Sequence, residues 1–410
     1  MSTLTNPTAP SAQPERSSLG ETWAAFRART RGGDLGAIPV VVGLVIIWTV
    51  FQILNPNFLS SANLVNLALQ CAAIGTIALG VVLVLLLAQI DLSIGSIAGL
   101  AAAILAVTFT QFGWPLAVSI IAALGAGGVL GWFYGFLYTR FGVPSFVITL
   151  AGLLGVLGIQ LWVLGKMGSI NIPFDSWIVQ FAQQMFLPNW VAYALSIIAA
   201  GGYVASNLLT ANRRDKAGLV SASKVGILIR GVLLLAVLLL GTWYLGTNRG
   251  VGLMFVLFIV LVVVVNYALT RTTWGRSIYA VGGNVEAARR AGIRVNRVYI
   301  SVFIISTSLA ALGGILAAAR LASANQSSGG GDTNLTAIAA AVIGGTSLFG
   351  GRGSAWSALL GIVVIQSIWS GLTLLSLDSS VRYMVTGAVL LLAVIIDSLS
   401  RRSRAMHGRA

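Results

Sequence analysis

The chain has 410 residues, of which 57% are hydrophobic and only 9% are charged, and its mean hydropathy is +0.93. A soluble domain carries about 25% charged residues, so this chain cannot cover a water-exposed surface and needs lipid as its solvent. The net charge of +15 does not indicate a nucleic-acid partner, because the basic residues lie between apolar segments, as in membrane proteins.

Several kinds of chemistry are excluded by missing residues. Cys71 and His407 are the only cysteine and the only histidine, which rules out an internal disulfide and a histidine-based metal site or catalytic dyad within the membrane. The chain has no G-x-x-x-x-G-K-[ST] phosphate loop, so it does not bind ATP by that motif. The acidic residues nearest the apolar segments, Asp91, Asp332 and Asp397, do not form a pair. We therefore predict no enzyme activity, no metal and no cofactor.

The chain begins with residues 1–37, which we expect to form a cytoplasmic segment, and continues as a series of apolar segments. They are rich in Leu, Val, Ile, Ala and Gly, and most approach the roughly 20 residues that a membrane helix needs. The tenth is short for a full span and is either re-entrant or broken. We expect an all-α polytopic helix bundle of about 12 spans. The segments are 38–54, 65–88, 94–111, 115–138, 145–165, 190–209, 225–245, 251–270, 299–319, 335–349, 355–375 and 381–397.

The basic residues predict the orientation. With the N-terminus inside, 21 of the 25 Lys and Arg residues fall on the cytoplasmic side, as the positive-inside rule requires. Both termini are then cytoplasmic, and residues 398–410 form a basic cytoplasmic tail. The longest inner loop is 271–298, with six Arg and one Glu. Only Lys166, Arg249, Arg320 and Arg382 lie outside.

One segment repeats a glycine every four residues, at Gly127, Gly131 and Gly135. Small residues at this spacing let two membrane helices approach closely. We expect the stripe to pack within the chain, with a subunit interface as the alternative.

Five stretches together resemble the permeases of bacterial ABC importers for ribose and xylose, in the order in which that family has them. The stretches are Asn55-Pro-Asn-Phe-Leu-Ser60, Ala88-Gln-Ile-Asp-Leu-Ser-Ile-Gly-Ser-Ile-Ala-Gly-Leu100, Gly142-Val-Pro-Ser-Phe-Val-Ile-Thr-Leu-Ala-Gly152, Thr273-Trp-Gly-Arg-Ser-Ile-Tyr-Ala-Val-Gly-Gly-Asn284 with Glu286-Ala-Ala-Arg-Arg-Ala-Gly-Ile293, and Ala340-Ala-Val-Ile-Gly-Gly-Thr-Ser-Leu-Phe-Gly-Gly-Arg-Gly353.

The resemblance implies a transmembrane permease domain over 38–397, with a ten-helix core built as two inverted halves. Residues 166–250 are an extra block with two more spans, a feature that resembles xylose-type permeases. The resemblance further implies a cytoplasmic tandem ATPase, a periplasmic or lipid-anchored sugar-binding protein and a second permease copy as partners. D-xylose or a related pentose or hexose is the expected substrate.

The same resemblance makes residues 271–298 the loop that couples the permease to its ATPase. Glycines and Asn284 allow tight turns, and residues 285–291 can form two helical turns that end at Gly292. The alternative is a solvated basic loop. The candidate coupling residues are Gly275, Gly282, Asn284, Glu286, Ala287, Ala288, Arg289 and Gly292.

Two further groups of residues are candidates for the transport path and for docking of the binding protein. We expect the pathway to be lined by Asp91, Ser93, Gly95, Ser96, Gly345, Thr346 and Ser347. We expect the binding protein to contact Lys166, Arg249 and Arg320, although these are equally well explained as loop charges.

An ion-coupled secondary transporter is the alternative function. Such a protein needs ionisable groups inside the membrane, and Asp91 is the only candidate well away from a chain end or an outer loop. Its carboxylate either binds a proton or caps the apolar helix that follows it.

Overall fold

The computed structural model describes residues 38–406 except 220 and 222. The expected cytoplasmic segment 1–37 and the last four residues of the basic tail, with His407, lie outside the described residues. The elements are α2 (Ile38–Leu54), α3 (Ser61–Leu86), α4 (Ile94–Ala106) with a π-helical turn (Val107–Gln111), α5 (Leu116–Phe141), α6 (Ser145–Leu164) with a 3-10 turn (Gly165–Met167), β1 (Ser169–Asn171), α7 (Trp177–Gln183), α8 (Asn189–Lys216), α9 (Lys224–Gly246), α10 (Leu253–Arg271), α11 (Thr273–Gly283), α12 (Val285–Arg290), α13 (Val295–Leu321), β2 (Ser323–Asn325), α14 (Gly331–Ile343), α15 (Ala355–Leu374) and α16 (Ser379–Met406).

The fold is an all-α membrane bundle, as predicted. Within residues 38–406, nine helices are long and apolar enough to cross a bilayer. The apolar parts of α2, α14 and α16 are shorter than a full span. Nine of the twelve expected segments therefore meet this length criterion. The chain is a multi-pass membrane protein.

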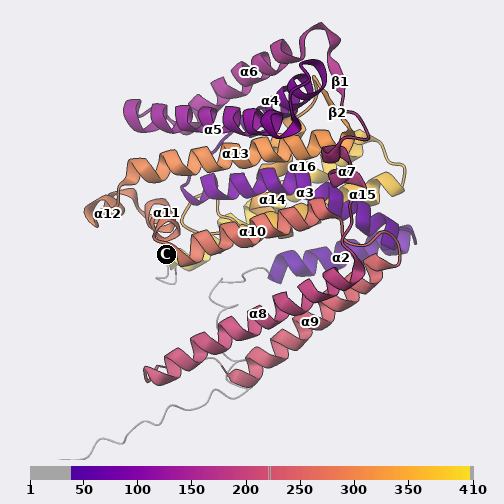
Figure 1. Cartoon of the computed structure of the whole chain (residues 1–410). Coiled ribbons are helices and arrows are strands. Elements are labelled where there is room, and N and C mark those ends of the chain that lie inside the picture. The colour runs from indigo at the N-terminus through magenta and orange to yellow at the C-terminus, as the bar shows by residue number, and fades with distance from the viewer. Residues whose placement is uncertain (1–37, 220, 222, 407–410) are drawn as a thin grey trace, which may run out of the picture.

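Helix α3 forms the centre of the bundle (Figure 1). From Cys71 to Leu86 every residue except Ile74 is buried. Helix α13 packs along it, and Ser306 Oγ of α13 donates a hydrogen bond to the carbonyl oxygen of Gly80 over 2.9 Å. Because this stretch of α3 is surrounded by protein, it is apolar on nearly all sides rather than amphipathic.

The glycine stripe of α5 packs inside the chain, against α13. A β-carbon on Gly127 would come within 2.7 Å of the Ala311 side chain, and one on Gly135 within 2.7 Å of Ile300. At Gly131 it would overlap the Thr307 hydroxyl oxygen and come within 2.5 Å of the carbonyl oxygen of Phe303. The expectation of intramolecular packing is confirmed.

We expect Gly131→Val to destabilise the purified permease by about 1–3 kcal/mol, since an overpacked helix interface must move apart. The thermal midpoint in detergent should fall by several degrees. The matched control is Gly125→Val on the same helix, because a β-carbon there meets nothing within 4 Å. Equal midpoints for the two variants would contradict this account of the stripe.

The extra block contains a helical hairpin at the edge of the bundle (Figure 1). Its helices α8 and α9 pack on each other, with Ser196 Oγ 3.1 Å from Thr242 Oγ1. The hairpin is tied to the core near the end of α9, where Tyr244 Oη donates a hydrogen bond to the carbonyl oxygen of Leu59. Most of its surface therefore remains free for lipid.

The two ends of the bundle differ in structure. At one end, here called the strand end, β1 pairs antiparallel with β2 through Ile170 and Ala324. This pairing joins the loop after α6 to the loop after α13. At the other end, the α12 end, lie α11 and α12 (Figure 1). Helix α3 starts at the strand end and finishes at the α12 end.

Helix α14 is only 13 residues long, or about 20 Å, against a hydrocarbon core of about 30 Å. Helix α4 also has 13 residues but continues through its π-helical turn to Gln111, which gives it the length of a span. The two helices meet at their N-terminal ends inside the protein, where Asn334 Nδ2 donates a hydrogen bond of 2.5 Å to the carbonyl oxygen of Leu92. The expected segment 335–349 is therefore a short helix followed by the loop 344–354, and its length does not suffice for a full span.

Candidate functional site

A cavity of about 780 Å³ lies between α3, α4, α13, α14 and α15 on the strand side of the bundle. Along α3 its lining changes from polar to apolar. Asn63, Asn66 and Gln70 follow one another at helical spacing from the strand end, and Ile74 and Ile77 continue the same face inward. A solute entering from the strand end meets amide groups first and an apolar floor below them.

The facing helix α15 adds Gln366, Trp369 and Ser370 to the lining. The face of the Trp369 ring is covered by the guanidinium of Arg382, which lies 5.8 Å from the ring centre. Arg320 of α13 and Asp332 of α14 also line the cavity. The cavity thus offers amides, hydroxyls and charges of both signs, which suits a polar solute.

None of the seven predicted pathway residues lines this cavity. Four of them lie around the start of α4 and are buried. Asp91 Oδ1 accepts hydrogen bonds from the backbone N–H and the hydroxyl of Ser93, at 2.8 and 2.7 Å, so the carboxylate holds the turn that precedes the helix. Ser96 Oγ donates to the carbonyl oxygen of Leu153, and Gly95 packs against Gly329 and Asn334.

The other three predicted pathway residues lie in the loop 344–354 at the α12 end. Gly345 is exposed, and its φ of +101° requires glycine. Thr346 and Ser347 are buried, and Ser347 Oγ accepts a hydrogen bond from the N–H of Phe349. These residues shape a turn that touches α11 rather than the wall of the cavity.

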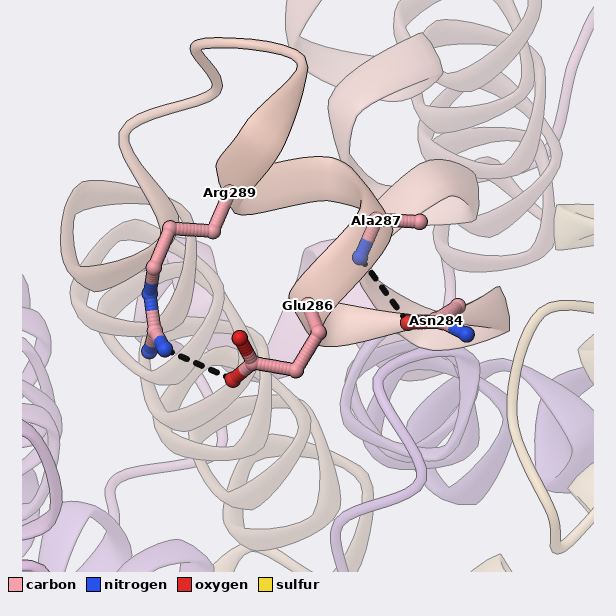
Figure 2. Close-up of polar contacts among 4 residues, drawn as sticks. All are labelled: Asn284, Glu286, Ala287 and Arg289. Atoms are coloured by element: carbon pink, nitrogen blue, oxygen red, sulfur yellow. Dashed lines mark hydrogen bonds and ion pairs between the residues drawn. The ribbon is translucent and has the colours of Figure 1, made fainter.

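Helices α11 and α12 form the inner loop predicted from the sequence. Asn284 Oδ1 caps α12 by accepting a hydrogen bond of 2.9 Å from the N–H of Ala287 (Figure 2). Glu286 and Arg289 pair at 2.7 Å on the outer surface of the same helix (Figure 2). Gly292, at φ +81°, ends the helix, with its N–H donating to the carbonyl oxygen of Arg289. The loop is therefore built as two helices with defined caps.

Helix α11 is seated tightly on the rest of the chain. A β-carbon on Gly282 would overlap the carbonyl oxygen of Leu86 at the end of α3 and come within 2.9 Å of the Gly351 nitrogen. Tyr279 Oη donates a hydrogen bond of 2.9 Å to the carbonyl oxygen of Gly353. Burial raises the pKa of Tyr279, so the phenol stays protonated and keeps this bond. A displacement of α11 must therefore act on α3 and on the loop 344–354.

The predicted coupling residues divide into two groups. Gly275, Gly282 and Ala288 face the chain itself: Gly275 and Ala288 are buried, and Gly282 is half-buried. The others are exposed and open to a partner, and they are Asn284, Glu286, Ala287, Arg289 and Gly292.

The predicted docking residues lie at the strand end, in different settings. Lys166 is exposed. Arg249 is exposed too, but it donates a hydrogen bond of 2.7 Å to Asn66 Oδ1 and lies 5.3 Å from the centre of the Phe186 ring. Arg320 is half-buried and faces the cavity. That Arg320 faces a cavity could not be predicted from the sequence, because the side chains that surround it come from distant helices.

Comparison with known proteins places the chain among transport permeases. Residues 63–394 match the family described as "Branched-chain amino acid transport system / permease component". The xylose transport system permease protein XylH of Escherichia coli K12 is 36% identical over 363 residues, which cover 88% of this chain and 90% of that protein. The fructose import permease protein FrcC of Rhizobium meliloti is 30% identical, with 89% and 86% covered. The ribose import permease protein RbsC of Escherichia coli K12 is also 30% identical, with 87% and 92% covered.

No solved structure matches this chain at a significant level. The resemblance to ribose- and xylose-type permeases, which was drawn from five short stretches, is confirmed over nearly the whole membrane domain. The chain belongs to the family of permease components of branched-chain amino acid-type transport systems, together with the xylose, fructose and ribose permeases.

Proposed function

We propose that the chain is the membrane-spanning permease subunit of an ATP-driven, binding-protein-dependent importer for D-xylose or a related pentose or hexose. The main observation in support is the α11–α12 unit, which is seated on α3 and on the loop 344–354 and presents capped, charged residues outward. A separate tandem ATPase that binds this surface on the cytoplasmic side would move α3 and α14 together.

The cavity is the proposed entrance of the transport path. It lies at the end opposite to α11 and α12, and its floor is closed by Ile74, Ile77 and neighbouring small residues. A periplasmic or lipid-anchored binding protein would release its sugar here, with Lys166 and Arg249 at the rim as docking charges. Two copies of the chain would flank one ATPase, as in the homodimeric assembly expected from the resemblance.

Helices α4 and α14 support the proposal of two inverted halves. Their N-terminal ends lie next to one another inside the protein, where Asn334 of α14 donates to the carbonyl oxygen of Leu92 before α4, as expected where two inverted halves meet. In this arrangement Asp91 holds the turn before α4 through Ser93, the N-cap residue, which favours a structural role in that turn over that of a proton carrier. The predicted positions 91, 93, 95 and 96 then stabilise the junction of the halves, while 345, 346 and 347 transmit movement of α11.

Uptake of labelled sugar tests this function. A strain without its own xylose transport should take up xylose only when this chain, a tandem ATPase and a binding protein from the same gene cluster are produced together. An uncoupler added while ATP is held constant should leave uptake unchanged. Uptake by the chain alone, or its immediate loss with the uncoupler, would instead support an ion-coupled secondary transporter.

The orientation is testable with single cysteines, because the native Cys71 is buried. We expect Lys166→Cys, at the strand end, to react with a membrane-impermeant maleimide in intact spheroplasts. Arg290→Cys, exposed on α12, should react only after the membrane is opened. The reverse pattern would place the α12 end outside and remove the proposed ATPase contact.

A further inference from the structure

Two glutamines in the cavity wall have no hydrogen-bonding partner in the part of the chain that the structure describes. They are Gln70 of α3 and Gln366 of α15, and only 2% of Gln366 is exposed. The neighbouring Asn63, by contrast, accepts a hydrogen bond from Ser370 and donates one to the carbonyl oxygen of Phe58. A buried amide without a partner is unfavourable, so the buried Gln366, with the half-buried Gln70 on the same cavity wall, points to a polar ligand that satisfies it.

The packing of α3 against α15 places these glutamines within about one helical turn of each other in depth. Ser370 Oγ donates to Asn63 Oδ1, and Cys71 Sγ lies 3.9 Å from the carbonyl oxygen of Ile362. These two contacts define the antiparallel register of the helices. Gln366 is midway between residues 362 and 370, so it lies level with residue 67 of α3, about one helical turn nearer the strand end than Gln70.

Helix α13 brings a third polar group to this depth. Its Gly313 packs against Ala73 and Ile77 of α3. Arg320 is seven residues, about two turns, nearer the strand end, which places it level with residues 66–70 of α3. Its guanidinium lines the cavity, and no carboxylate lies within 4 Å of it among the described residues. The three side chains thus come from three helices and line one cavity at similar depth.

We propose that Gln70, Gln366 and Arg320 form a hydrogen-bonding ring that binds one neutral monosaccharide midway along the transport path. Each amide both donates and accepts, as each sugar hydroxyl does, and the arginine fork offers several donors in fixed geometry. Sugars also bind by stacking on aromatic rings. One face of the Trp369 ring is closed to such stacking, because the Arg382 guanidinium covers it. Below the ring, Ile74 and Ile77 offer no polar group, so the sugar would pause at this level.

This inference rests on the proposed function for its choice of ligand, and its first test uses transport. Gln366→Met keeps the length of the side chain and removes both hydrogen-bonding groups. We expect the maximal rate of xylose uptake to fall about tenfold, the loss expected for one to two hydrogen bonds. The half-saturating concentration should stay unchanged, since it reports capture by the binding protein. Gln70→Met should act alike, and Gln180→Met on α7, outside the cavity, should transport normally.

A second test detects binding without the ATPase. Thr373→Cys lies at the exposed rim of the cavity and is the only reactive thiol, because Cys71 is buried. In the purified full chain in nanodiscs, xylose should slow maleimide labelling of Thr373→Cys. The protection should disappear when Gln366→Met is added. Neutral xylose should protect better than the negatively charged galacturonate.

The outcomes separate the two proposals. Protection without ATP-dependent uptake would overturn the proposed function and leave the ring standing. Normal uptake in Gln366→Met and Gln70→Met, or protection that persists in Gln366→Met, would overturn the ring. Stronger protection by galacturonate than by xylose would overturn its assignment to a neutral sugar. Equal purified yields and equal thermal midpoints of the variants exclude misfolding as the cause.

Discussion

Replacing Gly282 by alanine is expected to reduce sugar uptake to below about one-tenth of the wild-type rate. The added methyl group would overlap the carbonyl oxygen of Leu86, which also accepts a hydrogen bond of 2.9 Å from the N–H of Gly351. Overpacking of this kind costs about 1–3 kcal/mol, so α11 would be lifted from its seat. A movement of α11 driven by the ATPase would then be transmitted poorly to α3 and to the loop 344–354.

The matched control is the next residue. Gly283→Ala changes the same residue type in the same helical turn, but its β-carbon meets nothing within 4 Å. It should retain uptake and ATP hydrolysis close to wild type. Membrane insertion of both variants is measured by quantitative blotting, and ATP hydrolysis by the reconstituted complex is followed in parallel. Equal uptake by both variants would show that the close seat of α11 is not needed for transport.

The positions of the helices could be predicted well because bilayer burial acts on the local sequence. Each of the twelve expected apolar segments contains a helix, and the boundaries mostly agree within a few residues. The two helices of the inner loop also follow local rules. Asn284 caps α12, and Gly292 ends it in a left-handed conformation, which the residue types alone predict.

The wall of the cavity could not be predicted, because it depends on how distant helices align. Gln366 and Gln70 are almost 300 residues apart in sequence and come to lie within about one helical turn of each other in depth only through the register of α3 against α15. A signal did exist within α3, where Asn63, Asn66 and Gln70 interrupt an apolar helix at helical spacing. The predicted pathway residues were instead taken from the stretches that resemble the family, and the structure places those residues in turns and at the start of a helix.

The small strand pairing and the seat of Arg320 were missed for a related reason. Strands of three residues, such as β1 and β2, have too short a pattern to stand out in a loop. Their pairing joins loops that are about 150 residues apart. Arg320 was read as an outer loop charge by the positive-inside count, which reports the side of the membrane but not whether a side chain faces water or a cavity.

Reversing the charge of Glu286 is expected to lower uptake at least tenfold without changing the amount of protein in the membrane. The Glu286–Arg289 pair is exposed, with 66% and 59% of the side chains accessible, and such pairs contribute at most about 1 kcal/mol to stability. A large loss in Glu286→Lys would therefore come from the partner surface, where a misplaced charge is worth several kcal/mol. Sugar-stimulated ATP hydrolysis by the reconstituted complex should fall with uptake.

The double variant Glu286→Lys/Arg289→Glu separates docking from helix stability. It restores an opposite-charge pair within α12, at the i, i+3 spacing that stabilises helices, but presents the charges to the partner in exchanged positions. If the two residues dock against the ATPase, uptake should stay low in the double variant. If the pair only stabilises α12, uptake should return toward wild type, and the charge-based contact with the ATPase would have to be abandoned. The residue types of α12 predict its caps. Exchanging the charges of Glu286 and Arg289 reveals whether they contact another protein.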